Sequence, residues 1–429
     1  MPRPARAYRI ATAIARSLIP LAARLSPRLA RSAAGREASA TRFRAWGDSG
    51  RDPSRPLVLV HAASAGELRQ AEPVVRRLRS ARPSWQLAIT CFSPSGIPVA
   101  AELPADVHGL LPWDRPEEVR RLLSALQPSV VAVSKLDLWP ELACQTHGQG
   151  VPLALIAATV RPSSGRLRWP ARPVLASAYA LIDRAAAVSQ DDAERLTRLG
   201  VRPDRITVEG DPRYDSVLER VPAPGSAAPA EPRLVAGSTW GPDDEVLLGA
   251  FAEVRARQPE ARLLIAPHEP TPDALARLSG RARRIGLPSP VPWGSPESAG
   301  APLAVLETIG GLAPLYGIGQ LAYVGGGFGR RGLHSVLEPA ALGVPVIVGP
   351  RWRESRDAIA LRSAGALVAL EGREPRAALT RQWLAWLADP ATRHLAGCAA
   401  REMVLSGAGA ADRCAALVLR LVEAGQGRP

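Results

Sequence analysis

The chain has 429 residues, of which 46% are hydrophobic and 22% charged, so a disordered or fibrous protein is excluded and two domains are expected. Its four cysteines form no CxxC pair, which argues against a structural zinc site or a disulfide-bonded scaffold and favours a reducing compartment. The net charge of +14 indicates anionic partners: nucleic acid, an anionic membrane surface, or phosphorylated and carboxylated substrates.

Residues 1–44 are the most basic stretch, with ten arginines and one acidic residue. Apolar residues recur every three or four positions between residues 10 and 25, which predicts an amphipathic helix. Arginines and Pro20 interrupt this run, so neither a bilayer-spanning helix nor a signal-peptide core is expected. We expect the helix to lie on an anionic membrane surface, and packing on the protein's own surface is the alternative. The apolar stripe consists of Ile10, Ile14, Leu18, Leu21 and Leu25.

Residues 45–220 alternate short apolar runs with helical patterns, as the strands and crossover helices of a parallel sheet do. Two helical faces, within residues 71–78 and 119–126, repeat apolar residues at i, i+3, i+4 and i+7. This βαβ repetition predicts an α/β fold with a doubly wound sheet. The expected strands are residues 57–63, 86–92, 130–134, 152–158 and 185–189.

Residues 221–232 are mainly Pro, Ala, Gly and Ser without apolar periodicity, which predicts an exposed linker. A second βαβ series follows, so residues 233–429 are expected to form a second Rossmann-like domain that includes the C-terminal helices. Two such domains normally bind ligand in the cleft between them, at the carboxyl ends of the strands. The expected strands are residues 233–238, 262–267, 303–307, 321–326, 345–349 and 366–370.

The sequence HAASAGE spans the end of the first expected strand and the start of a helix near Gly66. A carboxylate at this position, Glu67, would suit a general base that takes a proton from a sugar hydroxyl. Ser64 and Glu67 also have the spacing of a capping box, so a purely structural role is the alternative.

The sequence SKLDLWP follows the strand expected at 130–134 and contains Lys135, the only lysine of the chain. If the extended chain continues, Lys135, Asp137 and Trp139 share one face. Lysine presents a compact point charge whereas arginine presents a planar fork, so a lone lysine in an arginine-rich chain favours a functional role. A buried structural ion pair is the alternative.

A glycine-rich segment follows the strand expected at 321–326 and precedes a helix that should begin near Ser335. Its backbone amides could approach a phosphate or carboxylate at the positive end of that helix. The segment lacks the GK[ST] of a P-loop. Ser335 and Glu338 have capping-box spacing, which competes with a role for Glu338 in binding ribose hydroxyls.

Two shorter motifs follow strands of the second half. GSTW could present Ser238 and Thr239 to a phosphate, with N-capping as the alternative, and APHEP places His268 after the next strand. No D-x-D sequence occurs, so a divalent metal bound in that way would have no ligands. The negative charge of a leaving group would then be stabilised by a helix dipole, histidine and arginine.

Seven blocks together resemble the 3-deoxy-D-manno-octulosonic acid (Kdo) transferases, whose GT-B fold places two Rossmann-like domains around a central cleft. The blocks are HAASAGELRQAEP, SPSG, SKLDLWP, AVSQDDAERLTRLGV with VEGDPRYD, GSTW, APHEP and GGGFGRRGLHSVLEPAALGVPVIVGP. The resemblance implies inverting transfer of Kdo from CMP-Kdo to a lipid A precursor, without a metal or other cofactor. It also implies a location at the cytoplasmic face of the inner membrane.

The resemblance implies roles for individual residues, with Glu67 as the catalytic base. On the acceptor side the family's acidic-Trp-Pro motif falls on Asp137, Trp139 and Pro140, and we expect Ser64, Gly66 and Lys135 to contact the acceptor as well. On the donor side the resemblance implies Ser238, Thr239, His268, Gly325, Gly326, Gly327, His334, Ser335 and Glu338. The chain departs from the family's usual pattern at three positions: Lys135 replaces the first of two acidic residues, the second is shortened to Asp137, and Ser335 replaces Asn.

Other functions remain open on the residues alone. One is a GT-B transferase for a different nucleotide sugar or a related ulosonic acid, and another is a noncatalytic binder of anionic lipids, which would have no use for the acid at position 67. A nicotinamide dehydrogenase is disfavoured because no G-x-G-x-x-G follows the first strand. Nucleic-acid binding is disfavoured because only 4% of residues are aromatic.

Overall fold

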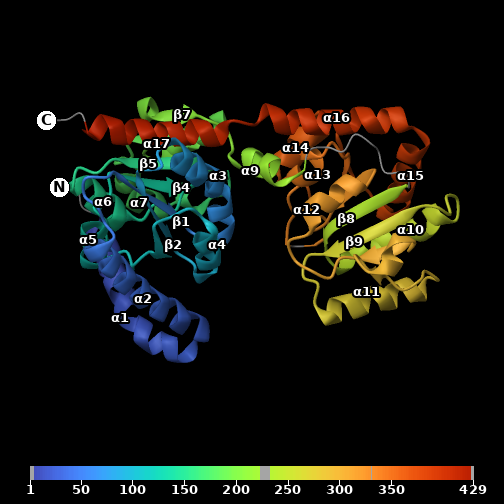
Figure 1. Cartoon of the computed structure of the whole chain (residues 1–429), viewed down its shortest axis with the longest axis horizontal. Helices are drawn as coiled ribbons and strands as arrows, with labels where there is room; N and C mark the ends of the chain where they lie inside the picture. Colours follow the sequence, from blue (N-terminus) through green and yellow to red (C-terminus); the bar gives the residue numbers. More distant parts are fainter. Residues whose placement is uncertain (1–3, 223–231, 330, 427–429) are drawn as a thin grey trace. The chain divides into compact units, whose positions relative to one another are not determined.

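The computed structural model describes residues 4–222, 232–329 and 331–426, and these form two compact units (Figure 1). Unit 1 comprises Met1–Ser216 and Ala408–Pro429, and unit 2 comprises Val217–Gly407. Within the described residues each unit contains one parallel sheet of seven strands. Residues 223–231 of the expected linker lie outside the described residues.

Unit 1 has the strand order β3-β2-β1-β4-β5-β6-β7. Every pair is parallel, and β1 lies between β2 and β4, so the direction of chain winding reverses between β1 and β4. The strands are β1 (Leu57–Ala62), β2 (Gln86–Cys91), β3 (Val107–Leu110), β4 (Val130–Ser134), β5 (Leu153–Ala158), β6 (Arg184–Ala187) and β7 (Ile206–Val208).

Unit 2 repeats this plan with the order β10-β11-β9-β8-β12-β13-β14, and its winding reverses between β8 and β12. The strands are β8 (Arg233–Thr239), β9 (Arg262–Pro267), β10 (Val291–Pro292), β11 (Leu303–Val305), β12 (Leu321–Val324), β13 (Val346–Val348) and β14 (Leu367–Ala369). The doubly wound α/β fold predicted from the apolar runs is confirmed, and each predicted run contains a strand.

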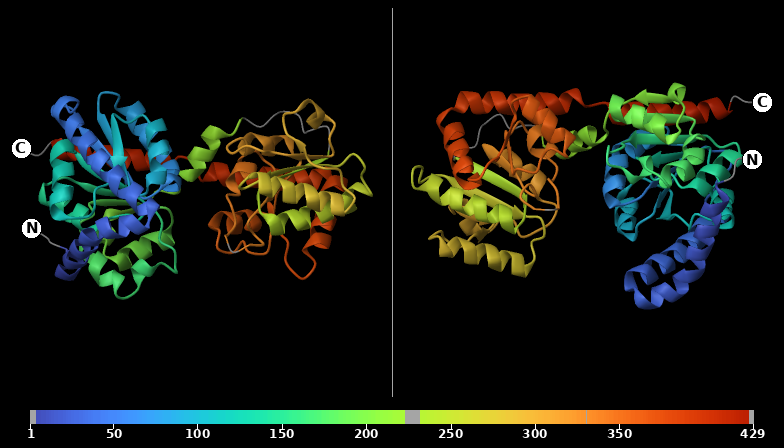
Figure 2. Two further views of the ribbon diagram at one scale, coloured as in Figure 1. Left: turned by 90° about the horizontal axis from the view of Figure 1, so that it is seen from below. Right: turned by 180° about the vertical axis from the view of Figure 1, so that it is seen from behind.

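Helices connect the strands and cover both faces of each sheet (Figure 2). In unit 1 they are α1 (Arg6–Leu25), α2 (Pro27–Ser49), α3 (Ala65–Ala81), α4 (Ile97–Glu102), α5 (Pro116–Leu126), α6 (Pro140–Gly148), α7 (Ala171–Tyr179), α8 (Gln190–Leu199) and α17 (Ala410–Gln426). Helix α9 (Arg213–Arg220) crosses the boundary between the units. In unit 2 they are α10 (Gly241–Arg255), α11 (Pro272–Arg284), α12 (Leu312–Leu315), α13 (Leu337–Ala341), α14 (Arg356–Ser363), α15 (Pro375–Ala388) and α16 (Pro390–Ser406).

The core of unit 1 lies on both faces of its sheet. Leu57 and Leu59 of β1 face one hydrophobic cluster, and Val58 and Val60 face another, as the period of two in a strand requires. The predicted apolar faces within 71–78 of α3 and 119–126 of α5 are buried in these clusters, one on each side. Burial of the strands on both faces explains why they are continuous apolar runs.

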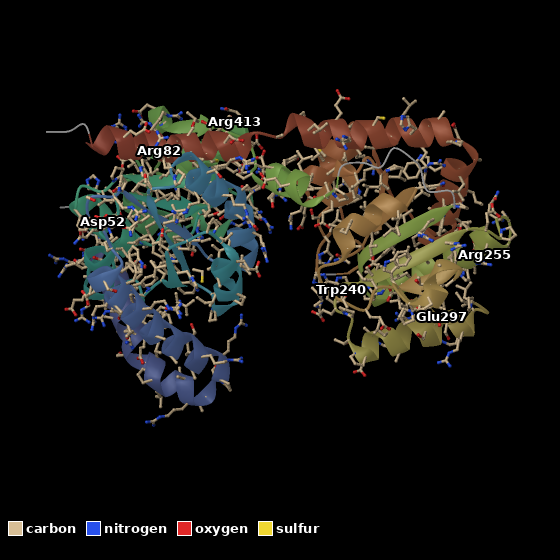
Figure 3. The ribbon with its side chains drawn as sticks, in the orientation of Figure 1. Asp52, Arg82, Trp240, Arg255, Glu297 and Arg413 are labelled. Atoms are coloured by element: carbon tan, nitrogen blue, oxygen red, sulfur yellow. The ribbon has the colours of Figure 1, made fainter. Side chains whose placement is uncertain are left out.

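Helix α17 belongs to unit 1, whereas the sequence assigned residues 233–429 to the second domain. Its apolar face completes the cluster under α3 with Ala411, Cys414, Val418 and Val422. Polar contacts reinforce this packing, because Arg82 at the end of α3 donates to Glu423 over 2.5 Å and Arg413 donates to the Glu209 carbonyl over 3.0 Å (Figure 3). The second domain therefore ends at Gly407 rather than at residue 429.

Helices α1 and α2 form an antiparallel pair that extends away from the sheet of unit 1 (Figure 1). The predicted amphipathic helix is confirmed, and the five residues of its apolar stripe are 54–86% exposed. The other face of α1 contacts the rest of unit 1 through polar side chains. Tyr8 donates to Asp114 over 2.6 Å. Arg9 pairs with Glu141 at 2.7 Å, and Arg16 pairs with Glu118 at 3.1 Å. None of the described helices combines the length and apolar character that a membrane crossing requires.

Candidate active site

Glu67 lies in the first turn of α3, directly after β1. Its Oε2 accepts a hydrogen bond from the Ala63 amide over 2.8 Å, and its side chain is 21% exposed. The Ser64 hydroxyl makes no capping hydrogen bond, so the predicted alternative of a reciprocal capping box does not form. Gly66 is exposed, and apart from its chain neighbours and the backbone of its own helix nothing lies within 4 Å of where its Cβ would be, so this side of the turn is open.

Lys135 lies next to Glu67 because β4 is the neighbour of β1. Its Nζ is 4.0 Å from Glu67 Oε1, the carboxylate oxygen that does not accept from Ala63. Burial lowers the pKa of the Lys135 ammonium, and the charge of Glu67 acts in the opposite direction. Lys135 has φ +57, so the chain turns here and does not continue as an extended strand, which was the condition for Lys135, Asp137 and Trp139 to share one face.

Asp137 is the centre of a hydrogen-bonded group next to this pair. Its Oδ2 lies 3.2 Å from His61 Nε2 and 3.2 Å from the indole nitrogen of Trp139, and its Oδ1 lies 3.4 Å from Arg166. Burial would raise the pKa of Asp137, but its hydrogen bond and charge interaction with His61, the Trp139 hydrogen bond and Arg166 together lower it. The buried His61 ring also contacts Thr90 of β2 at 3.0 Å, so Asp137 is tied to both β1 and β2.

The indole of Trp139 stacks on Phe92, with ring centroids 4.8 Å apart and an angle of 20° between the planes. Phe92 in turn is held by Arg36 of α2, which is 4% exposed and donates to the Phe92 carbonyl over 2.9 Å. The Arg36 guanidinium lies 4.5 Å from the centroid of Phe92 and 4.0 Å from that of Trp113. Burial lowers its pKa to about 10. Arg36 therefore links the α1–α2 pair to the predicted acceptor motif.

In unit 2, Trp240 (labelled in Figure 3) forms a cluster of rings with His268 and His334 beyond β8, β9 and β12. The Trp240 indole donates to His334 Nε2 over 3.1 Å, and the two histidine rings are stacked 4.1 Å apart. Burial lowers the pKa of His334 to about 4, and the neighbouring His268 adds to this effect. His268 is exposed, and Arg331 lies 3.9 Å above the Trp240 ring.

The glycine-rich turn packs closely against the residues that follow β8. A Cβ on Gly325 would lie 2.3 Å from the Ser238 carbonyl oxygen, and Gly326 has φ +93. The Gly326 amide donates to Asp243 over 3.1 Å, so this amide is not free to bind an anion. Asp243 also accepts from the Trp240 amide and the Tyr323 hydroxyl, and it thereby fixes both turns. Gly327 is buried in the same turn, packed on Gly349.

The remaining predicted donor residues differ in their surroundings. Ser238 has φ +53, and the hydroxyl of Thr239 is buried beside the Asp244 carboxylate, with which it shares a hydrogen bond. The N-cap of α10 is Trp240, so N-capping does not explain these two side chains. Helix α13 begins at Leu337 rather than at Ser335 and has five residues, which leaves little macrodipole for an anion. Ser335 is exposed, and burial raises the pKa of Glu338.

The predicted residues thus form two groups, one at each point where the winding of a sheet reverses. The structure brings Glu67, Lys135, Asp137 and Trp139 together in unit 1, and His268, His334 and the turns around Ser238 and Gly325 together in unit 2. Such reversal points are where open α/β sheets bind ligands. Within the described ranges, no three Cys, His, Asp or Glu side chains form a metal-binding group.

Sequence reasoning missed the residues that hold these groups in place. They are His61, Phe92, Arg36 and Arg166 in unit 1, and Trp240, Asp243 and Arg331 in unit 2. His61 and Trp240 lie within the HAASAGE and GSTW motifs, so their place in those motifs was an available signal. Arg36 carried no such signal, because the contact between Arg36 and Phe92 joins residues 56 positions apart.

Comparison with known proteins agrees with this arrangement. The fold resembles the crystal structures of UDP-GlcNAc 2-epimerase from Neisseria meningitidis (TM-score 0.59, 14% identity, 86% of this chain and 100% of that chain) and a glycosyltransferase from Rickettsia africae (TM-score 0.56, 11% identity, 87% and 100%). This likeness places the chain in the GT-B class of folds.

Sequence comparison identifies the family. A family model described as 3-deoxy-D-manno-octulosonic-acid transferase matches residues 23–216. The 3-deoxy-D-manno-octulosonic acid transferase of Bordetella pertussis is 32% identical over 390 residues, which cover 86% of this chain and 89% of that protein. The chain therefore belongs to the family of 3-deoxy-D-manno-octulosonic acid transferases.

Proposed function

We propose that this protein transfers Kdo from CMP-Kdo to a sugar hydroxyl of a lipid A precursor, with inversion and without a metal ion. The observation that carries the proposal is Glu67, a partly exposed carboxylate at the carboxyl end of β1, held by one oxygen and with a lysine beside the other. A general base must be fixed in place and still reach a substrate proton, and this arrangement meets both requirements. Membership of the Kdo transferase family supports the choice of the sugar.

In the proposed reaction Glu67 takes the proton of the acceptor hydroxyl, the oxygen attacks the anomeric carbon of Kdo, and CMP leaves. The acceptor sugar lies against the Trp139 indole, with Asp137 holding that ring, while Ser64 and Gly66 form the open edge of the turn. Lys135 meets a negative group of the substrates, either an acceptor phosphate or the Kdo carboxylate. Its compact charge beside Glu67 supports this role.

The donor is proposed to bind unit 2. Ser238 and Thr239 face its phosphate, the glycine turn with Gly325, Gly326 and Gly327 shapes the surface, and Glu338 meets the ribose. His268, as the exposed ring of the stacked pair, is the histidine able to approach the leaving phosphate, whereas His334 accepts from Trp240 and stays neutral near pH 7. Ser335 lies at the edge of this surface. Hydrogen bonds and positive charge at the departing phosphate would lower the barrier.

The substitution Glu67→Gln tests the proposal. Wild-type protein incubated with CMP-Kdo and a lipid A precursor should yield a product heavier by whole Kdo units in a mass spectrum. Glu67→Gln should lower the rate by about 1,000-fold or more, through loss of the base and of its charge. The same variant should still be stabilised by CMP in a thermal-shift assay, because the donor side is unchanged.

Glu72→Gln is the matched control, since Glu72 lies on the same helix and forms its ion pairs with Arg69 and Arg76. Near-normal turnover by Glu67→Gln would reject Glu67 as the base. Stabilisation by UDP rather than CMP would instead reject the donor.

We also propose that α1 attaches the protein to the anionic surface of the inner membrane, at its cytoplasmic face. The exposed apolar stripe supports this, because Arg9 and Arg16 are engaged with unit 1 and the apolar side chains face outward. The double substitution Ile14→Glu/Leu18→Glu should weaken binding to phosphatidylglycerol vesicles about 100-fold, from the lost burial of two apolar side chains. Flotation with vesicles measures this.

The control pair is Ile309→Glu/Leu395→Glu, which alters two exposed apolar residues of unit 2. Equal losses in both double variants would show that α1 has no special part in vesicle binding.

A further inference from the structure

A hollow of about 340 Å³ lies between α2 and the turn that follows β2. It is lined by Arg28 and Arg31 from α2 and by Ser93, Pro94 and Ser95 from the turn. The proposed roles above use none of these residues. Helix α2 packs against β3 and α5, so the two arginines project from a helix that is fixed to unit 1.

Neither guanidinium group has a carboxylate partner within the part of the chain that the structure describes. On the adjacent helix, Arg9 and Arg16 are paired with Glu141 and Glu118. Arg28 and Arg31 are exposed, three residues apart on one helix, and therefore on the same face. Two unneutralised arginines side by side repel each other, and a doubly charged anion between them would relieve that repulsion.

The opposite wall supplies hydroxyl groups. The Ser93 and Ser95 hydroxyls lie 2.9 Å apart, and the Ser95 amide contacts the Ser93 oxygen at 3.4 Å. Both hydroxyls can rotate to donate to an anion. Two planar guanidinium forks and two hydroxyls match a phosphate monoester, which offers three acceptor oxygens and up to two negative charges.

The hollow is joined to the acceptor motif through the chain itself. Phe92 immediately precedes Ser93, and its ring stacks on Trp139. Arg36, two turns beyond Arg28 on α2, holds the Phe92 carbonyl and ring. A phosphate bound in the hollow would therefore lie at a set position relative to the Trp139 indole.

We infer that this hollow, formed by Arg28, Arg31, Ser93 and Ser95, binds a phosphate monoester of the glycolipid acceptor. The inference rests on the proposed function and adds to it a subsite that would position the acceptor. Bulk phospholipids carry related chemistry in their headgroups, so the experiment must separate a phosphate on the acceptor from general attraction to the membrane.

The test compares Arg28→Gln/Arg31→Gln with Arg24→Gln/Arg44→Gln. The second pair removes the same charge from exposed positions of α1 and α2 that do not line the hollow. Transfer is measured with an acylated glucosamine disaccharide carrying two phosphates and with the two monophosphates. For the bisphosphate, the KM of the first variant should rise about tenfold or more, with kcat little changed, while the second variant stays near wild type.

Two further comparisons complete the test: binding of acceptors that carry one or two phosphates, and binding to vesicles that contain no acceptor. Wild type should bind one of the two monophosphates about tenfold more weakly than the bisphosphate, and Arg28→Gln/Arg31→Gln should lose that difference. Both variants should weaken equally on phosphatidylglycerol vesicles without acceptor. Equal rises in KM for both variants, or a loss for the first variant that is the same on all acceptors, would overturn the inference.

Failure of the proposed function is distinguishable, because it would appear as no transfer by wild type to any acceptor. Binding of each acceptor in detergent without donor, followed by tryptophan fluorescence, then decides the inference by itself. The first variant should bind the bisphosphate about tenfold more weakly than the control variant, and equal binding by the two would overturn the subsite.

Discussion

In unit 1 the side chains beyond the central strands carry formal charges, Glu67, Lys135 and Asp137, whereas those beyond the central strands of unit 2 are mainly aromatic rings and glycine turns. Both groups lie where the winding of a seven-stranded parallel sheet reverses. The fold therefore explains where each group lies and does not explain what it can do. The chemistry comes from the few residues placed at the strand ends.

The two groups are also held in different ways. In unit 1 side chains brace one another over long sequence separations, from Arg36 through Phe92 and Trp139 to Asp137 and His61. In unit 2 the buried Asp243 fixes the backbone of two turns. We therefore expect substitutions in unit 1 to act by removing a charge or its partner. In unit 2 we expect them to act through the hydrogen bonding and protonation of the histidine rings.

The largest effect is expected from Asp137→Ala. This change leaves His61, Trp139 and Arg166 without their shared acceptor and should lower the free energy of unfolding by about 3 kcal/mol. Denaturant unfolding measures it. Asp204→Ala, which removes an exposed ion pair with Arg202, should leave the free energy of unfolding nearly unchanged. Similar costs for the two substitutions would show that the network in unit 1 contributes no more than a surface pair.

A middle-sized effect is expected from Lys135→Arg. A planar fork does not reproduce a compact ammonium, so kcat/KM should fall about tenfold. Burial lowers the pKa of Lys135, so its charge is present below that pKa and is lost as pH rises through it. Wild-type activity should therefore decline at a lower pH than an ordinary lysine would give, and the variant should lack that decline. Full activity of Lys135→Arg across the pH range would contradict the proposal that this position requires a compact ammonium charge.

The smallest effect concerns His334. Its pKa is lowered from 6.5 to about 4 in the folded protein, so the stability that depends on the neutral ring is present above about 6.5 and is lost as pH falls through about 4. Since the ring is partly exposed, we expect the loss to be about 1 kcal/mol. His334→Gln, which keeps an acceptor for Trp240, should flatten this slope in urea unfolding between pH 7 and 4. His147→Gln is the control, and an unchanged slope in His334→Gln would contradict the assignment.

Much of the fold could be predicted because buried parallel strands leave continuous apolar runs, and runs such as 130–134 coincide with β4. The short strands β3, β7 and β10 were missed because a His, Thr or Pro interrupts them, whereas the equally short β11 and β13 are wholly apolar. The position of α17 could not be predicted, because an amphipathic pattern indicates that a helix packs but not on which sheet.

For the candidate site, the sequence placed reactive residues after the correct strands but could not give their partners. Lys135 was expected to align with Asp137, and its left-handed backbone turns it toward Glu67 instead. His61 and Asp137 are 76 positions apart in the sequence, and they make contact because the sheet places β1 beside β4. Tertiary pairing of this kind leaves no mark on local patterns.

The return of α17 to unit 1 has a consequence for biosynthesis. The ribosome makes β1 early, but the part of the apolar cluster around α3 that α17 covers stays exposed until residues 410–426 have emerged, by which time all of unit 2 has been translated. A fragment ending near residue 216 would lack Cys414, Val418 and Val422 from its core and would expose the patch that they cover. Supplying residues 408–429 as a separate peptide should rescue such a fragment, as complementation does in split proteins.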